Sequence, residues 1–92
     1  MAVKLLLVDD EEDLVTLLRF VMEQVGFQVA TAQHGKAALE LLDKAAETAP
    51  DSLPNVIITD VMMPEMDGFS LVNALSERDH TRHIPVIIMT AK

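Results

Sequence analysis

Three aspartates follow apolar segments of the kind that form buried strands. The segment Lys4–Val8 ends on Asp9 and Asp10, and residues 56–59 end on Asp60. A short continuous apolar stretch is typical of a parallel strand, and ligands of such sheets bind beyond the carboxyl ends of the strands. Carboxylates that converge there repel one another unless a cation joins them, and oxygen-only ligands favour Mg²⁺ over zinc or copper. The three acids therefore predict a magnesium site.

Helix capping is the alternative for the first acidic cluster. Acids at residues 9–13 would lie near the start of a helix, where negative charge interacts favourably with the helix dipole. Asp60 has no such explanation, because it ends an apolar segment and no helix is predicted immediately after it. Both interpretations of the first cluster stay open at this point.

Apolar spacing predicts alternating strands and helices along the chain. One amphipathic helix ends before Gly26, and its apolar positions are Leu14, Leu17, Leu18, Val21, Met22 and Val25. A strand at residues 27–32, a helix that begins at Gly35 and a surface connection at residues 48–55 follow. After the strand that ends at Asp60, we expect a helix with Phe69, Val72 and Leu75 on one side, and a last strand at residues 84–90.

The order β-α-β-α-β-α-β predicts an α/β fold. Right-handed crossovers make this order a parallel sheet with helices on both faces. Within the loop after Asp60, we interpret Pro64 and Gly68 as shaping the loop, and Gly68 also as relieving crowding before the next helix. The methionines 62, 63 and 66 are either packing residues or a helix-docking surface, and packing is the favoured interpretation.

Length, composition and charge limit the function classes. The 92 residues are half hydrophobic and predict a single domain. The net charge of −8 argues against direct nucleic-acid binding and against an anionic membrane surface. No apolar run approaches the roughly 20 residues that span a bilayer, so we expect a cytoplasmic protein. The three histidines, His34, His80 and His83, fall in predicted turns, and we expect them to be solvated.

Three segments resemble the receiver domain of two-component response regulators. They are Leu7-Val8-Asp9-Asp10-Glu11, Asp60-Val61-Met62-Met63-Pro64-Glu65-Met66-Asp67-Gly68 and Pro85-Val86-Ile87-Ile88-Met89-Thr90-Ala91. The resemblance covers essentially the whole chain and implies a flavodoxin-like strand order.

The resemblance also implies roles for particular residues. Asp60 would be the phosphoacceptor, receiving a phosphoryl group from a sensor histidine kinase or a phosphotransfer protein. Asp9 and Asp10 would hold Mg²⁺ together with Asp60 and the backbone carbonyl of Met62. Thr90 would be the switch hydroxyl, although an ordinary β-branched strand residue is the alternative. Such a domain is not an enzyme beyond Mg²⁺-dependent self-phosphorylation and self-dephosphorylation.

The chain departs from the family pattern at its end. A complete receiver domain resembles this one but continues with a helix, a fifth strand that ends in a lysine, and a further helix. Lys92 lies two residues after Thr90 and is not equivalent to that lysine. We therefore interpret residues 1–92 as the N-terminal four-strand portion of a receiver domain.

An uncovered fourth strand predicts self-association, because unpaired strand edges pair with other chains. We expect a homo-oligomer formed through residues 86–88, and a purely monomeric species in light scattering would contradict it.

Two other functions are compatible with parts of the sequence. The first is a truncated receiver that acts as an interaction or structural unit, or as an oligomerising fragment, without productive switching. That the chain is a fragment of a longer regulator is an equal alternative to self-association. The second, a Mg²⁺-dependent phosphohydrolase, ranks last because Met62 occupies the position where that chemistry needs a general acid.

Overall fold

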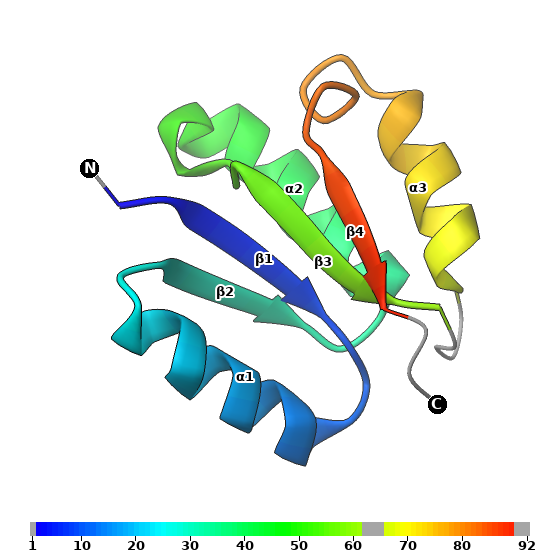
Figure 1. Ribbon diagram of the computed structural model, residues 1–92. Coiled ribbons are helices and arrows are strands. Elements are labelled where there is room, and N and C mark those ends of the chain that lie inside the picture. The colour runs from blue at the N-terminus through cyan, green and yellow to red at the C-terminus, as the bar shows by residue number, and fades with distance from the viewer. Residues whose placement is uncertain (1, 62–65, 90–92) are drawn as a thin grey trace.

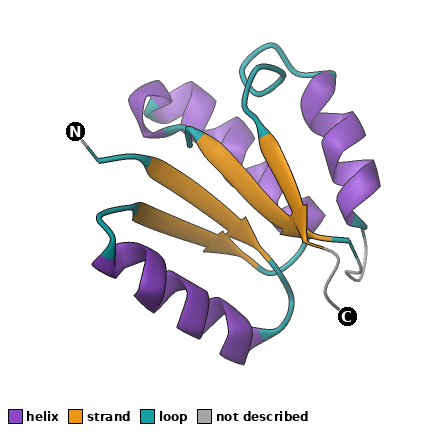
Figure 2. Ribbon diagram, in the orientation of Figure 1, coloured by secondary structure: helices purple, strands orange, loops and turns teal. Residues whose placement is uncertain are grey.

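A computed structural model describes residues 2–61 and 66–89 of the chain. Its elements are, in order, β1 (Lys4–Val8), α1 (Glu12–Gln24), β2 (Gln28–Ala32), α2 (Gly35–Thr48), the 3₁₀ turn η1 (Pro50–Ser52), β3 (Val56–Asp60), α3 (Gly68–Ser76) and β4 (Val86–Met89). This alternation of strand and helix (Figure 2) confirms the predicted order. None of the helices in the described part of the chain is long and apolar enough to cross a membrane.

The four strands form one parallel sheet in the order β2-β1-β3-β4. This arrangement confirms the flavodoxin-like α/β fold, with β1 and β3 side by side in the middle (Figure 1). Four consecutive residues of β1, from Leu5 to Val8, are at most 2% exposed. The continuous apolar run of β1 therefore reflects a strand that is buried on both faces, as expected for a parallel sheet.

The main hydrophobic core lies between the sheet and the helices α2 and α3, which cover one face (Figure 1). The sheet contributes Leu6, Val8, Ala32 and Ile57, α2 contributes Ala38, Leu39 and Leu42, α3 contributes Leu71 and Leu75, and Ile84 closes the cluster. These side chains are at most 8% exposed. Their burial is the largest favourable term that holds α2 and α3 against the strands.

The opposite face of the sheet carries only α1 among the described helices (Figure 1). Leu14, Leu18 and Met22 of α1 are half-buried, whereas Leu17, Val21 and Val25 are 45–69% exposed. The prediction that helices cover both faces is therefore confirmed, although the two faces are covered unequally. The spacing of apolar residues correctly predicts the helix α1. The apolar side of α1 is, however, wider than the part of the helix that contacts the sheet.

The strand β4 lies at one end of the described sheet and pairs with β3. Ile87 on it is 54% exposed, whereas Val86 and Ile88 are half-buried. Association through this edge stays a prediction.

Phe69 of α3 does not lie on the buried side of its helix, contrary to the sequence prediction. It is 62% exposed, whereas Leu71 and Leu75 are buried. At 3.6 residues per turn, Phe69 and Leu71 lie about 200° apart around the helix, so only one of them can face the core. Leu75 therefore shares the buried side of the helix with Leu71 and not with Phe69.

Two histidines that were expected to be solvated make specific contacts. His34 is half-buried, and its Nδ1 accepts a hydrogen bond of 3.1 Å from the N–H of Ala37 at the start of α2. His80 places Nε2 2.8 Å from Oδ1 of Asp43. The prediction was wrong for His80 because its carboxylate partner belongs to α2, far away in the sequence. His83 is exposed, as expected.

Asp43 also joins α2 to the turn after α3 through Arg78. Nε of Arg78 donates to Oδ1 of Asp43 at 2.9 Å, and a second guanidinium nitrogen donates to Oδ2 at 3.3 Å. A third donates to the carbonyl of Ala74 at 3.0 Å. This contact fixes the two helices of the core layer relative to each other.

The Asp43 contact predicts a defined pH dependence of stability. The hydrogen bond from Arg78 lowers the pKa of Asp43, with a further contribution from His80. A carboxylate whose pKa is lowered by folding stabilises the fold above its unfolded value and loses that effect as pH falls through the folded value. Because the Asp43 side chain is 45% exposed, solvent screening limits the effect to less than about 1 kcal/mol.

We therefore expect Asp43→Asn to lower the free energy of unfolding at about pH 5 and to lower it less at about pH 2.5, where more of the Asp43 carboxylate is protonated. Thermal unfolding at both pH values measures the difference. Asp79→Asn is the matched control, because the Asp79 side chain is 95% exposed. A difference of the same size at both pH values would contradict this account.

Candidate metal centre

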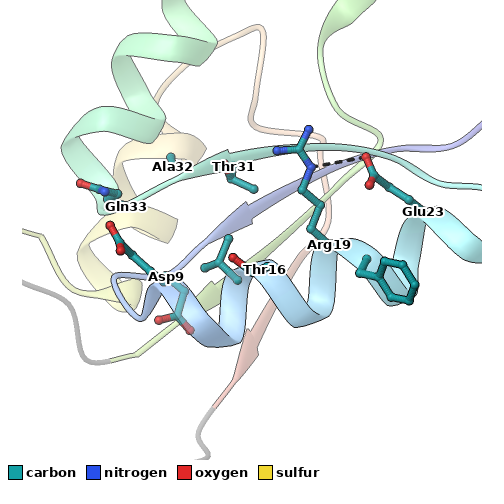
Figure 3. A pocket seen from close by; sticks show the side chains of 10 residues that line it. Asp9, Thr16, Arg19, Glu23, Thr31, Ala32 and Gln33 are labelled. Carbon is teal, nitrogen blue, oxygen red and sulfur yellow. Dashed lines mark hydrogen bonds and ion pairs between the residues drawn. The ribbon is translucent and has the colours of Figure 1, made fainter.

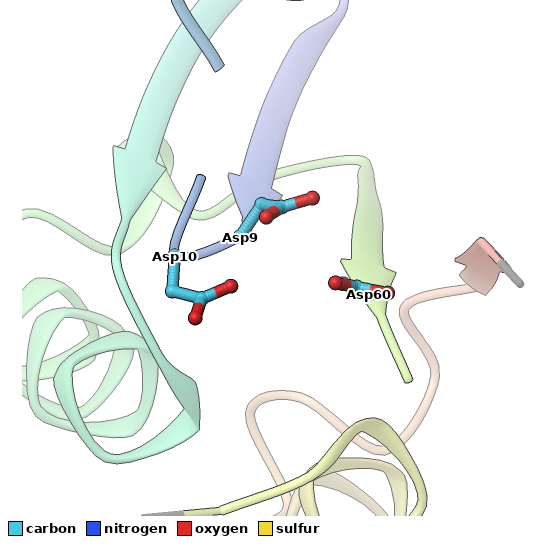
Figure 4. Close-up of side chains that lie close together, drawn as sticks. All are labelled: Asp9, Asp10 and Asp60. Atoms are coloured by element: carbon cyan, nitrogen blue, oxygen red, sulfur yellow. The ribbon is translucent and has the colours of Figure 1, made fainter. Parts of the chain in front are cut away.

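Asp9, Asp10 and Asp60 converge at the carboxyl edge of the sheet, as the sequence predicts. Each offers one carboxylate oxygen, and the three oxygens lie within 4.8 Å of one another. Figure 4 shows Asp9 and Asp10 at the end of β1 and Asp60 at the end of β3, arranged around a common space. Asp9 is 2% exposed and Asp60 is 3% exposed, whereas Asp10 is exposed. The site is thus a buried pair of acids with a third acid on its solvent side.

The strand register explains the convergence. Val8 of β1 pairs with Thr59 of β3, so that Asp9 and Asp60 are the next residues on two adjacent parallel strands. The N–H of Asp9 donates to the carbonyl of Ala32 at 3.1 Å, which extends the hydrogen bonding with β2 by one residue. The backbone of Asp9 is thereby fixed by hydrogen bonding between the strands.

Asp60 is held in the same way on the other side of the centre. It is the last residue of β3 and pairs with Met89 of β4. The following residue, Val61, donates its N–H to the carbonyl of Met89 at 3.2 Å. Both buried acids therefore sit on backbone that neighbouring strands fix.

The capping alternative for the first acidic cluster turns out to be compatible with ligation. Oδ1 of Asp9 accepts a hydrogen bond of 2.9 Å from the N–H of Glu11, which forms a turn just before α1. Glu11 is the N-cap residue of α1, and its side chain makes no capping hydrogen bond. A carboxylate has about four lone-pair positions, so Asp9 can shape this turn and also bind a cation.

The donor set suits Mg²⁺. This ion takes six oxygen ligands at about 2.0–2.1 Å in octahedral geometry, so adjacent ligand atoms are about 3 Å apart and opposite ones about 4.2 Å apart. The three carboxylate oxygens lie within 4.8 Å of one another and would close further around the ion. The exposed position of Asp10 leaves the solvent side open for the water ligands that Mg²⁺ usually keeps. Met62 and Thr90, to which the family resemblance assigns roles, lie outside the described residues.

The start of α3 packs directly against the backbone of Asp60. The N–H of Gly68 donates to the carbonyl of Val61 at 3.0 Å, and a Cβ added at Gly68 would lie 2.6 Å from the carbonyl oxygen of Asp60. Asp67 caps the helix by accepting a 2.8 Å hydrogen bond from the N–H of Ser70, and this bond lowers the pKa of Asp67. The interpretation that Gly68 relieves crowding is therefore confirmed.

A groove opens from Asp9 along α1 and β2, with a volume of about 500 Å³ (Figure 3). Glu12 lines it beside Asp9, and the ion pair between Arg19 and Glu23, 3.3 Å long, lies farther along it. Sequence reasoning did not find this groove, because it forms between a helix face and a strand edge.

The fold and the site together define a class of protein. A parallel sheet in the order β2-β1-β3-β4, with acids at the ends of the two middle strands, is a flavodoxin-like domain with an acidic centre at its switch point. The family model of the response regulator receiver domain matches residues 5–92. The chain therefore belongs to the receiver domain family of response regulators.

Several proteins are similar to this chain. Response regulator PleD of Caulobacter vibrioides is 41% identical over 91 residues, which cover 99% of this chain and 18% of PleD. The crystal structure of the signal receiver domain of a histidine kinase from Syntrophus aciditrophicus is 33% identical with a TM-score of 0.86, and the match covers 99% of this chain and 64% of that one. The structure of the phosphorylated cyanobacterial phytochrome response regulator RcpA is 26% identical with a TM-score of 0.81, and the match covers 96% and 64%. The chain thus spans less than a fifth of PleD and less than two thirds of each of these two structures.

The packing of Gly68 predicts that Gly68→Ala displaces Asp60. The added methyl group would meet backbone, so we expect a loss of stability of about 1–3 kcal/mol and a shift of the Asp60 amide resonance. Urea unfolding and nuclear magnetic resonance measure the two effects.

The matched control is Gly26→Ala. Gly26 has φ 105° and no atom within 4 Å of an added Cβ, so the change strains the backbone far from the centre. It should lower stability without moving the Asp60 resonance. A Gly68→Ala protein with an unmoved Asp60 resonance would show that the close approach is absent in solution.

Proposed function

We propose that the chain is the phosphoacceptor part of a two-component signalling pathway and that Asp60 accepts the phosphoryl group. The donor is the phosphohistidine of a sensor histidine kinase or of a phosphotransfer protein. The observation that carries the proposal is the convergence of Asp9, Asp10 and Asp60 at the end of the two middle strands of a receiver domain. The solved structure of a phosphorylated relative, RcpA, supports it.

The reaction makes and breaks few bonds, and the protein contributes mainly the nucleophile and its positioning. A carboxylate oxygen of Asp60 attacks the phosphorus, the bond between phosphorus and the donor imidazole nitrogen breaks, and an acyl phosphate forms on Asp60. The fixed strand end holds the nucleophile in place, which matters because phosphoryl transfer depends on in-line positioning. At 3% exposure, the Asp60 side chain is also largely shielded from water.

Phosphoryl transfer to a carboxylate needs positive charge, because acceptor and donor are both anions. Mg²⁺ held by Asp9, Asp10 and Asp60 supplies that charge when bound, with the backbone carbonyl of Met62 as the further ligand that the family resemblance implies. In the described structure, these carboxylates already lie within 4.8 Å of one another. Asp9 and Asp10 therefore act as the cation-holding residues and Asp60 as both ligand and nucleophile.

Thr90 is the proposed switch residue. It directly follows Met89, which pairs with Asp60 across β3 and β4. By family resemblance, its hydroxyl group would donate a hydrogen bond to a phosphoryl oxygen and so carry the signal to the surface. We propose no turnover of an external substrate. The cytoplasmic location expected from the sequence stays a prediction.

The proposal predicts Mg²⁺-dependent phosphorylation at one residue. Incubation with acetyl phosphate and Mg²⁺ should give a single phosphoryl adduct in intact-mass spectrometry. Asp60→Asn should abolish the adduct, because an amide is a much poorer nucleophile than a carboxylate. Chelation of Mg²⁺ should also abolish it, because the anionic donor then approaches an uncompensated acidic site.

Asp51→Asn is the matched control, since Asp51 is an exposed acid of η1 outside the centre, and it should be labelled like the parent chain. An adduct that survives Asp60→Asn would place the acceptor elsewhere. A folded parent chain that takes no label would favour the interaction unit as its function.

A further inference from the structure

The first residue of α2 contacts the segment that leads from Asp60 into α3. Gly35 is buried at this point, and a Cβ added to it would lie 2.9 Å from both Cβ and Cγ of Met66 and 3.0 Å from Sδ. Met66 is half-buried and packs against the hydrophobic core. Cβ atoms essentially never approach so closely, so the contact leaves no room for a side chain at residue 35.

We propose that Gly35 and Met66 are positioning residues for Asp60, an inference that rests on the proposed function of Asp60 as acceptor. Two residues after Met66, Gly68 donates its N–H to Val61 and lies against the carbonyl group of Asp60. The start of α2 thus fixes Met66, Met66 fixes the start of α3, and α3 fixes the backbone of Asp60.

The starts of α2 and α3 are both held in place, so neither helix can easily shift away from the contact. At the start of α2, His34 caps the helix through the N–H of Ala37, and Ala38 is fully buried in the core. At the start of α3, Asp67 caps the helix and Leu71 is fully buried. Closely packed cores transmit such displacements instead of absorbing them.

The atoms of Met66 that meet Gly35 include its Cβ. The thioether end of methionine is flexible and can rotate away from a clash, but Cβ moves only with the backbone. A methyl group at residue 35 would therefore push the backbone of residue 66, which is two residues from the glycine that touches Asp60. Displacements of about 1 Å at a reacting group can cost on the order of 100-fold in rate.

A role in packing alone makes a different prediction. In that case a change at Gly35 lowers stability but leaves the chemistry of the folded fraction unchanged. The experiment must therefore separate the rate and the position of Asp60 from stability.

The test compares Gly35→Ala with Gly26→Ala, the same chemical change at a residue with no neighbour within 4 Å. The first measurement is the initial rate of labelling by acetyl phosphate at saturating Mg²⁺, per folded molecule. We expect Gly35→Ala to lower this rate by about 10- to 100-fold and Gly26→Ala to leave it unchanged. In the exchange variant Gly35→Ala/Met66→Gly, the glycine stands at residue 66 and the methyl group at residue 35, so the clash is removed. This variant should recover most of the labelling rate.

The second measurement is the amide resonance of Asp60 in the metal-free protein. It should move in Gly35→Ala, return toward its original position in the exchange variant, and stay in place in Gly26→Ala. If Gly35→Ala does not fold, Met66→Ala keeps only the Cβ of residue 66 against Gly35 and removes the rest of the contact without adding volume. This variant should move the same resonance and slow the labelling.

The outcomes separate the two proposals. A parent chain without label would overturn the proposed function, whereas the Asp60 resonance would still decide whether residue 35 positions that backbone. Equal rates and equal Asp60 resonances in the Gly35 and Gly26 variants would overturn the positioning role and leave Met66 as a packing residue.

Discussion

The candidate centre depends on one constraint, which is the parallel pairing of β1 with β3 in the middle of the sheet. This pairing brings Asp9 and Asp60 to the same level at one edge. Carboxylates that lie a few ångströms apart repel each other when both are ionised. The fold brings these acids together, and a bound cation would offset their repulsion. The arrangement therefore fits the proposed cation site.

The two faces of the sheet contribute unequally to that organisation. The face under α2 and α3 holds the closely packed core, and both glycine contacts near Asp60 come from those helices. The face under α1 is less covered, and α1 leaves several apolar side chains exposed. The proposed acceptor, Asp60, therefore lies against the well-packed layer, whereas α1 and Asp10 border the side that is open to solvent.

Local patterns predicted much of the fold and the centre. The apolar runs before Asp9 and Asp60 correctly predicted two buried strands with acids at their ends. This prediction was possible because the burial of a strand shows in the composition of a short segment, and the order of the segments restricts how they connect. The glycine before α3 was likewise interpretable from its place between the acceptor and a predicted helix.

The remaining features depend on packing between distant segments. The contact of His80 with Asp43 joins residues 37 positions apart, and that of Gly35 with Met66 joins α2 to the loop after β3. No local pattern marks either pair. The prediction for Phe69 failed for a different reason. The sequence alone does not decide which side of a short helix faces the core, because that depends on the elements that pack against it. The width of the covered stripe on α1 is likewise a property of the whole assembly.

The most direct test of the centre is a crystal structure of the chain with Mn²⁺ in place of Mg²⁺, examined by anomalous scattering. One strong peak is expected between the carboxylates of Asp9, Asp10 and Asp60, within coordination distance of all three. The peak should disappear in Asp60→Asn crystals grown in the same way. A peak at another place, or none at Mn²⁺ concentrations that saturate a typical carboxylate site, would contradict the claim that the fold assembles these three acids into a cation site.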